Sequence, residues 1–181
     1  MPIVSTDIIY RLSTTAGTAG NTVVAGAPGT SLGKYMSTSS ILDGVTDNVF
    51  PDITGDENAA SNIDYQCVFV YNSNATLTLQ NAVIWLAAEI VGGANVAIAL
   101  DSVGAVAAGS TAAQATTITG KNVTPSPVGV FSSPTTKAAG LLIGNLNPGQ
   151  VYAVWIRRSA TNSPSQSSDG VTLRIEGDTV A

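Results

Sequence analysis

Histidine is absent from the 181-residue chain, and cysteine occurs only once. Histidine is the commonest general base in enzymes and a frequent zinc ligand, so its absence removes the usual routes to both chemistries. A single cysteine excludes an internal disulfide. Cys67 stands in an apolar alternating stretch with no cationic neighbour, which predicts a buried structural thiol. We therefore expect no catalytic residue, no zinc or redox-metal site and no cofactor.

Charge is also scarce. Only 10% of the residues are charged, against about 25% in ordinary soluble domains. The net charge of -5 and the pI of about 4.3 argue against direct binding to nucleic acid, because such binders are normally basic. A surface of Ser, Thr, Asn and Gly loses little when another protein covers it, since few charges must be desolvated. This composition favours a subunit of an assembly; a secreted or extracellular sandwich domain is the alternative.

Long apolar runs are missing as well. The mean hydropathy is +0.27, yet the longest apolar run, residues 82–88, is far shorter than the roughly 18 residues of a membrane span. Residues 1–12 lack a basic head followed by an apolar stretch, so no signal peptide is expected. We predict no contact with a membrane.

What the chain does contain is alternation of apolar and polar residues with a period of two. In residues 65–72 the aromatic residues and Cys67 share one face while Val68 and Val70 share the other, as in a strand buried on both sides. Residues 146–179 predict a turn, a strand, a polar loop and a last alternating strand, paired with each other. Strands are expected at residues 7–12, 65–72, 75–80, 82–90, 95–100, 115–119, 138–143, 151–158 and 171–176.

This pattern predicts an all-β fold, an antiparallel β-sandwich of the immunoglobulin-like or jelly-roll type, in one domain spanning residues 1–181. Residues 82–90 also permit a short helix, although their β-branched and aromatic content favours a strand. Residues 13–48 are rich in small polar residues, with a weak strand signal at 22–25. We expect this segment to be an extended arm over neighbouring subunits, or else plain surface loops.

Two motifs resemble catalytic or ligand-binding patterns and fail on inspection. Residues 29–33 match the G-x-S-x-G nucleophile elbow, but no histidine is available as a base and the flanks are not strand and helix. Residues 29–35 also resemble the phosphate-loop pattern G-x-x-x-x-G-K-[ST]. The spacing between the two glycines is one residue too short, and Tyr35 stands where the pattern has the Ser or Thr that binds magnesium.

Leu146-Asn147-Pro148 followed by Tyr152 fits a tyrosine corner, in which the tyrosine hydroxyl bonds to the backbone just upstream; a plain core tyrosine fits equally.

Charged residues gather in two places. Six acids lie in residues 43–64 with no Lys or Arg among them, which predicts a solvated acidic patch, an electrostatic docking surface or a calcium site, although the spacing is not that of an EF-hand. Three arginines lie in the last two strands. We hypothesise that they bind the acidic segment of a neighbouring subunit or capsid protein; charges that protect edge strands are the alternative. The candidate interface is Arg157, Arg158, Arg174, Asp43, Asp47, Asp52, Asp56 and Glu57.

Several stretches together resemble virion structural proteins of tailed bacteriophages. They are DIIYRLS at 7–13, SLGK at 31–34, DYQCVFVYN at 64–72, YAVWIRR at 152–158 and TLRIEGDT at 172–179. The resemblance implies a particle component that is not an enzyme. We expect a capsid decoration or cement protein, made in the bacterial cytoplasm and placed on the capsid surface. Its partners would be the major capsid protein and copies of itself.

Other functions remain open at this point. A tail or baseplate protein would share the same composition. A carbohydrate-binding sandwich module would need exposed aromatic platforms, whereas Trp85 and Trp155 lie in strongly apolar stretches and are expected in the core. No small-molecule substrate is predicted.

Overall fold

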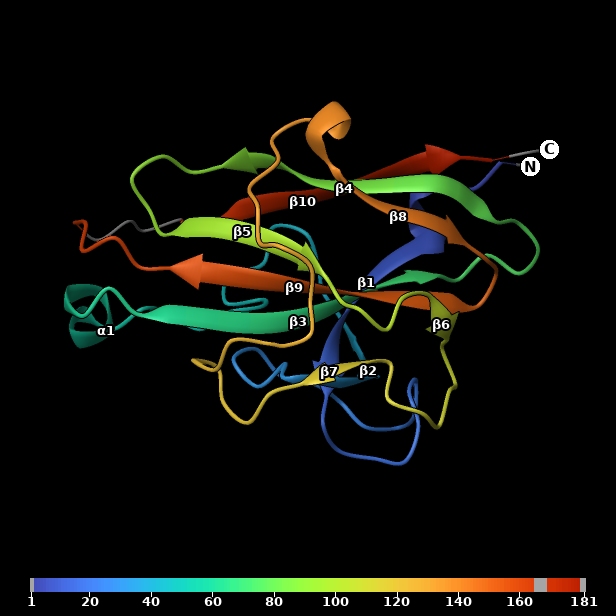
Figure 1. The fold of residues 1–181 in the computed structure, drawn as a ribbon, viewed down its shortest axis with the longest axis horizontal. Helices are drawn as coiled ribbons and strands as arrows, with labels where there is room; N and C mark the ends of the chain where they lie inside the picture. The colour runs from blue at the N-terminus through green and yellow to red at the C-terminus, as the bar shows by residue number, and fades with distance from the viewer. Residues whose placement is uncertain (1, 165–168, 180–181) are drawn as a thin grey trace.

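The computed structural model of the chain describes residues 2–164 and 169–179, and it is built almost entirely of strands (Figure 1). The predicted all-β sandwich is confirmed. The strands are β1 (Ile8–Thr14), β2 (Gly33–Ser40), β3 (Ile63–Asn72), β4 (Leu79–Glu89), β5 (Asn95–Leu100), β6 (Val106–Ala107), β7 (Ala115–Thr117), β8 (Leu141–Leu146), β9 (Gln150–Ser159) and β10 (Val171–Asp178). Short helices are η1 (Ser5–Asp7), α1 (Gly55–Ala59) and η2 (Lys137–Ala139).

The strands form two antiparallel sheets. The main sheet has the order β5-β9-β3-β1-β2-β7, with β6 also paired to β9, and it curls away from the second sheet at its β2 and β7 end (Figure 1). The second sheet has the order β10-β4-β8. The chain crosses between the sheets from β3 to β4 and crosses back from β8 to β9, and these four strands pair as β3 with β9 and β4 with β8.

Both faces of the main sheet are buried, as the alternation in β3 predicts. Val68 and Val70 of β3 lie in the cluster between the two sheets, with apolar residues of β4, β5, β8 and β9. Phe69 and Cys67 point to the opposite face, into a second cluster that also holds Trp155. Loops and the short strands β6 and β7 cover this second face. The buried position of Cys67 agrees with a structural thiol, and burial raises its pKa well above the ordinary value.

The ambiguous segment 82–90 is a strand. It belongs to β4, which runs from residue 79 to 89. Asn81 was expected either to break or to bulge the strand, and it bulges it. The pairing register with β8 shifts between Leu79 and Ala82, and Asn81 has a φ of 50°. Asn81 is therefore a bulge within one long strand, which asparagine tolerates because it enters the left-handed region more easily than other residues with side chains.

The expectation for residues 13–48 is corrected. The segment contains β2, an eight-residue strand between β1 and β7, and the weak signal at 22–25 is not a strand. The loop before β2 is held on its own domain, since Gly20 N donates to the Ser110 carbonyl at 3.0 Å. Sequence reasoning missed β2 because its residues, GKYMSTSS, contain few of the apolar side chains that reveal alternation.

The last two strands do not pair with each other as expected. β9 lies in the main sheet between β3 and β5, whereas β10 is an edge strand of the second sheet beside β4. Part of the polar loop predicted between them, residues 165–168, lies outside the described residues. Tyr152 does not form a tyrosine corner, because its hydroxyl donates to the carbonyl of Asp101, 3.3 Å away and 51 residues upstream.

Gly33 is the position where a glycine is indispensable for the sheet. Its φ is +91°, and a Cβ built there would lie 1.8 Å from the Thr116 carbonyl oxygen of β7. We expect Gly33→Ala to lower the free energy of unfolding by more than ~2 kcal/mol, since it adds left-handed strain to a backbone clash. Urea unfolding measures the loss. Gly44→Ala is the control, because Gly44 also has positive φ but has nothing within 4 Å of its Cβ position; equal losses in both variants would refute the clash.

Candidate interface

The three arginines of the candidate interface do not form one patch. Arg157 and Arg158 are neighbours on β9, so their side chains point to opposite faces of the main sheet. The Arg157 guanidinium carbon lies 5.4 Å from the ring centre of Phe131, on the face that carries Trp155. Arg174 lies on β10 in the other sheet, above the ring of Trp85. The common docking patch predicted for these residues is therefore divided among three surroundings.

Arg158 is bound within its own chain. One of its guanidinium nitrogens lies 3.0 Å from a carboxylate oxygen of Asp64, and another donates to the Pro51 carbonyl at 2.6 Å. The ring of Phe50 covers it at 4.5 Å. The side chains of Arg158 and Asp64 are only 12% and 6% exposed. The acidic segment 43–64 thus does meet an arginine, but it is an arginine of the same chain, and the pair holds the 50–51 loop on β9.

A second cation extends this ion pair. Lys121 Nζ lies 2.7 Å from Glu57 and 3.4 Å from Asp64. Glu57 sits in the first turn of α1, where Thr54 caps the helix and Glu57 accepts hydrogen bonds from the Thr54 backbone and hydroxyl. The hydrogen bond from Lys121, followed by those from Thr54, lowers the pKa of Glu57 from 4.5 to about 2, and the same contact raises the pKa of Lys121. Sequence reasoning missed Lys121 because it stands 57 residues from Asp64.

This network predicts an acid dependence of stability. A carboxyl whose folded pKa is below its unfolded value stabilises the fold fully above the unfolded pKa and loses that contribution as the pH falls through the folded pKa. For Glu57 the loss runs from about pH 4.5 down to about pH 2. We expect Lys121→Met to flatten this part of the curve of unfolding free energy against pH. Lys34→Met removes the same charge from a half-buried lysine that makes no ion pair with a described residue, and it should leave the slope unchanged. Parallel curves for the Lys121 and Lys34 variants would contradict the assignment.

The remaining acids of the segment face solvent. Asp43, Asp47, Asp52 and Asp56 are exposed and form no ion pair with any described residue. Within residues 2–164 and 169–179, no three Cys, Asp or Glu side chains come together in a group that could hold a metal ion. The segment therefore divides into an exposed acidic part and a part, Glu57 and Asp64, that is neutralised internally.

Ser31 of the G-x-S-x-G motif is a structural residue. It is fully buried, and its hydroxyl donates to the Cys67 carbonyl at 2.7 Å and accepts from the Ser13 backbone N–H at 2.6 Å. A hydroxyl fixed in this way inside the sheet has no access to a substrate. The loop before β2 uses Ser31 to satisfy backbone groups where β1, β2 and β3 meet.

Asp101 is a buried carboxylate that sequence reasoning did not single out. It is 2% exposed, and it follows β5 directly. One of its oxygens accepts from Trp155 Nε1 at 2.8 Å and from Thr116 N at 2.9 Å, and the other accepts from Val103 N at 2.9 Å. These bonds join β5, β7 and β9 across the second core cluster. The only signal in the sequence is an acid at the end of an apolar strand, which also fits an ordinary turn.

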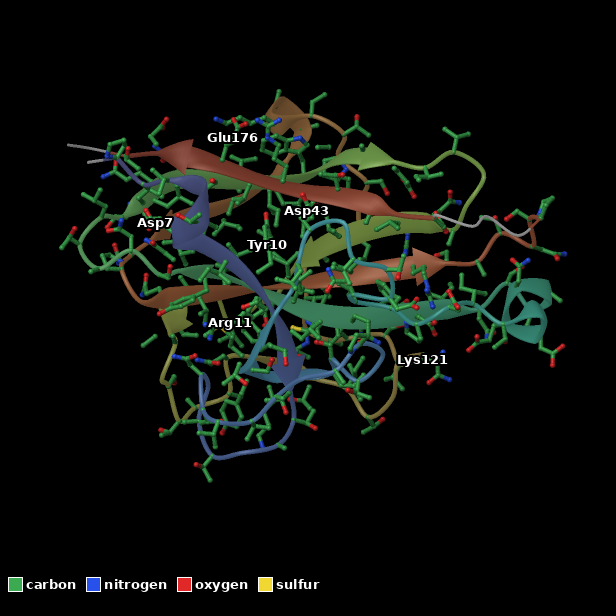
Figure 2. The ribbon with its side chains drawn as sticks, turned by 180° about the vertical axis from the view of Figure 1, so that it is seen from behind. Asp7, Tyr10, Arg11, Asp43, Lys121 and Glu176 are labelled. Atoms are coloured by element: carbon green, nitrogen blue, oxygen red, sulfur yellow. The ribbon has the colours of Figure 1, made fainter. Side chains whose placement is uncertain are left out.

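The outer face of β10 carries the remaining charges of interest. Arg174 is 59% exposed and lies 2.7 Å from Glu176 on the same strand, while Glu176 also lies 3.3 Å from Lys137. Beside β10 runs a groove of about 520 Å3, lined by residues 173–177 and, across from them, by residues of the amino-terminal segment and β1. Figure 2 shows Tyr10 of β1 below β10, on which Glu176 is labelled.

Comparisons with known proteins give no relative. No family model matches the chain, and neither the curated proteins nor the solved structures include a significant match. None of the helices in the described residues has the length and apolar character needed to cross a bilayer.

Proposed function

We propose that the protein is a non-enzymatic structural subunit of a phage particle, most specifically a capsid decoration protein. The observation that carries the proposal is the distribution of apolar side chains outside the core. Large apolar residues stand exposed on loops and edges around the sandwich, on a surface that bears little charge: Val23, Leu42, Val91, Val130 and Leu142 are each more than 60% exposed. Such positions are covered at low desolvation cost when a neighbouring protein packs on them.

The proposed mechanism follows from the rigidity of the block. A main sheet buried on both faces keeps its loops in fixed positions, so the loops need little ordering when they contact a capsid. Each contact buries apolar area at roughly 25 cal/mol per Å2, and contacts repeated by the symmetry of a particle act together through effective concentration. The resemblance to virion structural proteins of tailed phages supports a particle as the setting.

The aromatic side chains favour this proposal over a carbohydrate-binding module. The chain has two Trp, five Tyr and three Phe residues, and each of these side chains is buried or half-buried. A module that binds sugars by stacking needs exposed rings. A glycan array should accordingly give no signal with the purified protein.

Copy number per particle tests the proposal. Quantitative mass spectrometry of purified virions of the phage that encodes this chain should find hundreds of copies, as a head lattice requires. A handful of copies, or multiples of six along a tube, would assign the protein to the tail or baseplate. Absence from purified particles would refute a virion role. If the protein is present in virions, its position can be found by adding purified protein to particles that lack it and imaging them by cryo-electron microscopy.

A further inference from the structure

The outer edge of β10 is an unpaired strand edge. β10 is the first strand in the order β10-β4-β8, and within residues 2–164 and 169–179 no backbone hydrogen bond reaches its other side. The groove beside it contacts five consecutive residues, 173–177. Because consecutive side chains of a strand point to opposite faces, a groove that contacts all five must run along the edge itself. The edge is therefore open to an added strand.

The geometry of this edge suits strand addition. Residues 173–176 pair with β4 residues 86–83 in unbroken register, and both irregularities in the pairing lie outside this stretch. β10 contains no proline. Protected edges commonly point a charge inward to repel a new strand, but here Arg174 and Glu176 are on the outer face, while Leu173 and Ile175 pack toward the core.

The rest of the groove is lined mainly by apolar side chains and holds an unsatisfied polar atom. Its lining residues there are Ile3, Val4, Ser5, Ile8, Tyr10 and Leu79. The Tyr10 hydroxyl is buried and has no hydrogen-bond partner among the described residues, and burial raises the pKa of Tyr10 well above its ordinary value. An added strand whose apolar side chains face the same way as Ile175 would cover this surface.

We propose that the strand added to β10 is β10 of a second copy, in antiparallel orientation about a two-fold axis at Ile175. In this register Arg174 lies directly opposite Glu176 of the second copy, and Glu176 lies opposite its Arg174. Directly opposite residues of antiparallel strands have their side chains on the same face and a few ångströms apart, so two Arg–Glu pairs form for one interface. Ile175 meets its own copy on the inner face, and Leu173 lies opposite Gly177, which has no side chain.

Other two-fold registers are less favourable. A two-fold axis between two residues would place the charged residues of one β10 opposite the core-facing residues of the other. The reason is that a shift of one residue in the pairing register moves each side chain to the other face of the sheet. An axis at Arg174 sets the two arginines opposite each other, and an axis at Glu176 does the same for the two glutamates. An axis at Leu173 pairs Arg174 with Thr172 and leaves Glu176 without a cation opposite it. Charge complementarity thus selects Ile175 as the centre.

The resulting dimer joins the two three-stranded sheets into one continuous sheet of six strands, β8-β4-β10-β10-β4-β8. The β10 dimer rests on the proposed function, because a subunit of a particle must contact its copies. The dimer should also form in the isolated protein, so the dimer can be disproved while the virion role stands. A monomeric protein that is present at hundreds of copies per particle would reject the β10 contact alone.

Charge reversal tests the register. Sedimentation equilibrium of the full chain should show a monomer–dimer equilibrium. Arg174→Glu and Glu176→Arg each replace both Arg–Glu pairs by like-charge pairs, so each should raise the dissociation constant about tenfold to hundredfold. The double variant Arg174→Glu/Glu176→Arg exchanges the charges and should return the constant to within about threefold of wild type. Asp56→Arg changes net charge as much as Glu176→Arg but lies on α1, and it should have no effect.

A disulfide provides a second measurement that does not depend on charge. Ile175→Cys places two thiols opposite each other at the axis, and mild oxidation should give a covalent dimer. Thr172→Cys is the control, since Thr172 would lie opposite Asp178 and not opposite itself. A protein that stays monomeric up to about 1 mM, single reversals without effect, a double variant as weak as the single ones, or equal crosslinking of both cysteine variants would each overturn the proposal.

Discussion

Replacing Asp101 by alanine is expected to lower the free energy of unfolding by ~3–5 kcal/mol. The carboxylate accepts three hydrogen bonds, from Trp155 Nε1, Thr116 N and Val103 N, and alanine would leave all three donors without this partner. Each unsatisfied buried donor costs about 1–3 kcal/mol. Urea unfolding followed by circular dichroism measures this loss. In the folded Asp101→Ala variant, the fluorescence emission of Trp155, which is fully buried in the wild type, should shift to the red.

Asp101→Asn is the matched control for this prediction. Asparagine keeps the shape and one carbonyl oxygen, which can still accept from Trp155 and Thr116, while its NH2 group faces the Val103 N–H. We expect a loss of about 1–2 kcal/mol. If alanine and asparagine cost the same, or if alanine costs less than ~1 kcal/mol, then the buried carboxylate does not hold β5, β7 and β9 together.

The second large effect is expected at the buried ion pair. Asp64→Ala removes the partner that lies 3.0 Å from Arg158 and leaves a guanidinium with 12% exposure uncompensated. Breaking such a pair from one side costs ~3–5 kcal/mol. Replacing both partners by apolar residues costs much less, because no buried charge remains. We therefore expect Asp64→Ala/Arg158→Met to be more stable than Asp64→Ala, as chemical unfolding would show.

This double-mutant cycle also bears on the candidate interface. If Arg158 docks on a neighbour, then Arg158→Met should reduce binding to particles while stability changes little. If Arg158 holds the 50–51 loop, the variant should lose stability, and binding should fall only in proportion to unfolding. We expect the second result. Asp43→Asn is a suitable comparison, because Asp43 is exposed and forms no ion pair with a described residue.

The success of the sequence analysis depended on side chains that alternate clearly. In β3 the aromatic residues and Cys67 face one way and the valines the other, and the structure places them in two separate clusters. In β9, Trp155 likewise lies on the face opposite Val154 and Ile156, as a period of two requires. β2 did not show this alternation, because buried positions in it include small polar residues such as Ser37, and serine is common in loops as well.

The candidate site was less predictable than the fold. The arginines were grouped because they are near in sequence and in the two last strands, but β9 and β10 belong to different sheets. Conversely, Lys121 and Asp64 come together from distant segments. Strand alternation decides which face a residue is on, whereas the partner across that face depends on strand order, which no local pattern records.

Composition and alternation alone therefore determined the all-β class, the burial of β3 on both faces and the buried state of Cys67, Trp85 and Trp155. The physical reason is that apolar side chains that recur with a period of two must leave water on defined faces of a sheet. Only the tertiary structure decided that Arg158 meets Asp64, that Asp101 joins three strands, and that β10 lies at an open edge. These facts depend on which strands become neighbours, and that choice is made by the packing of the whole chain.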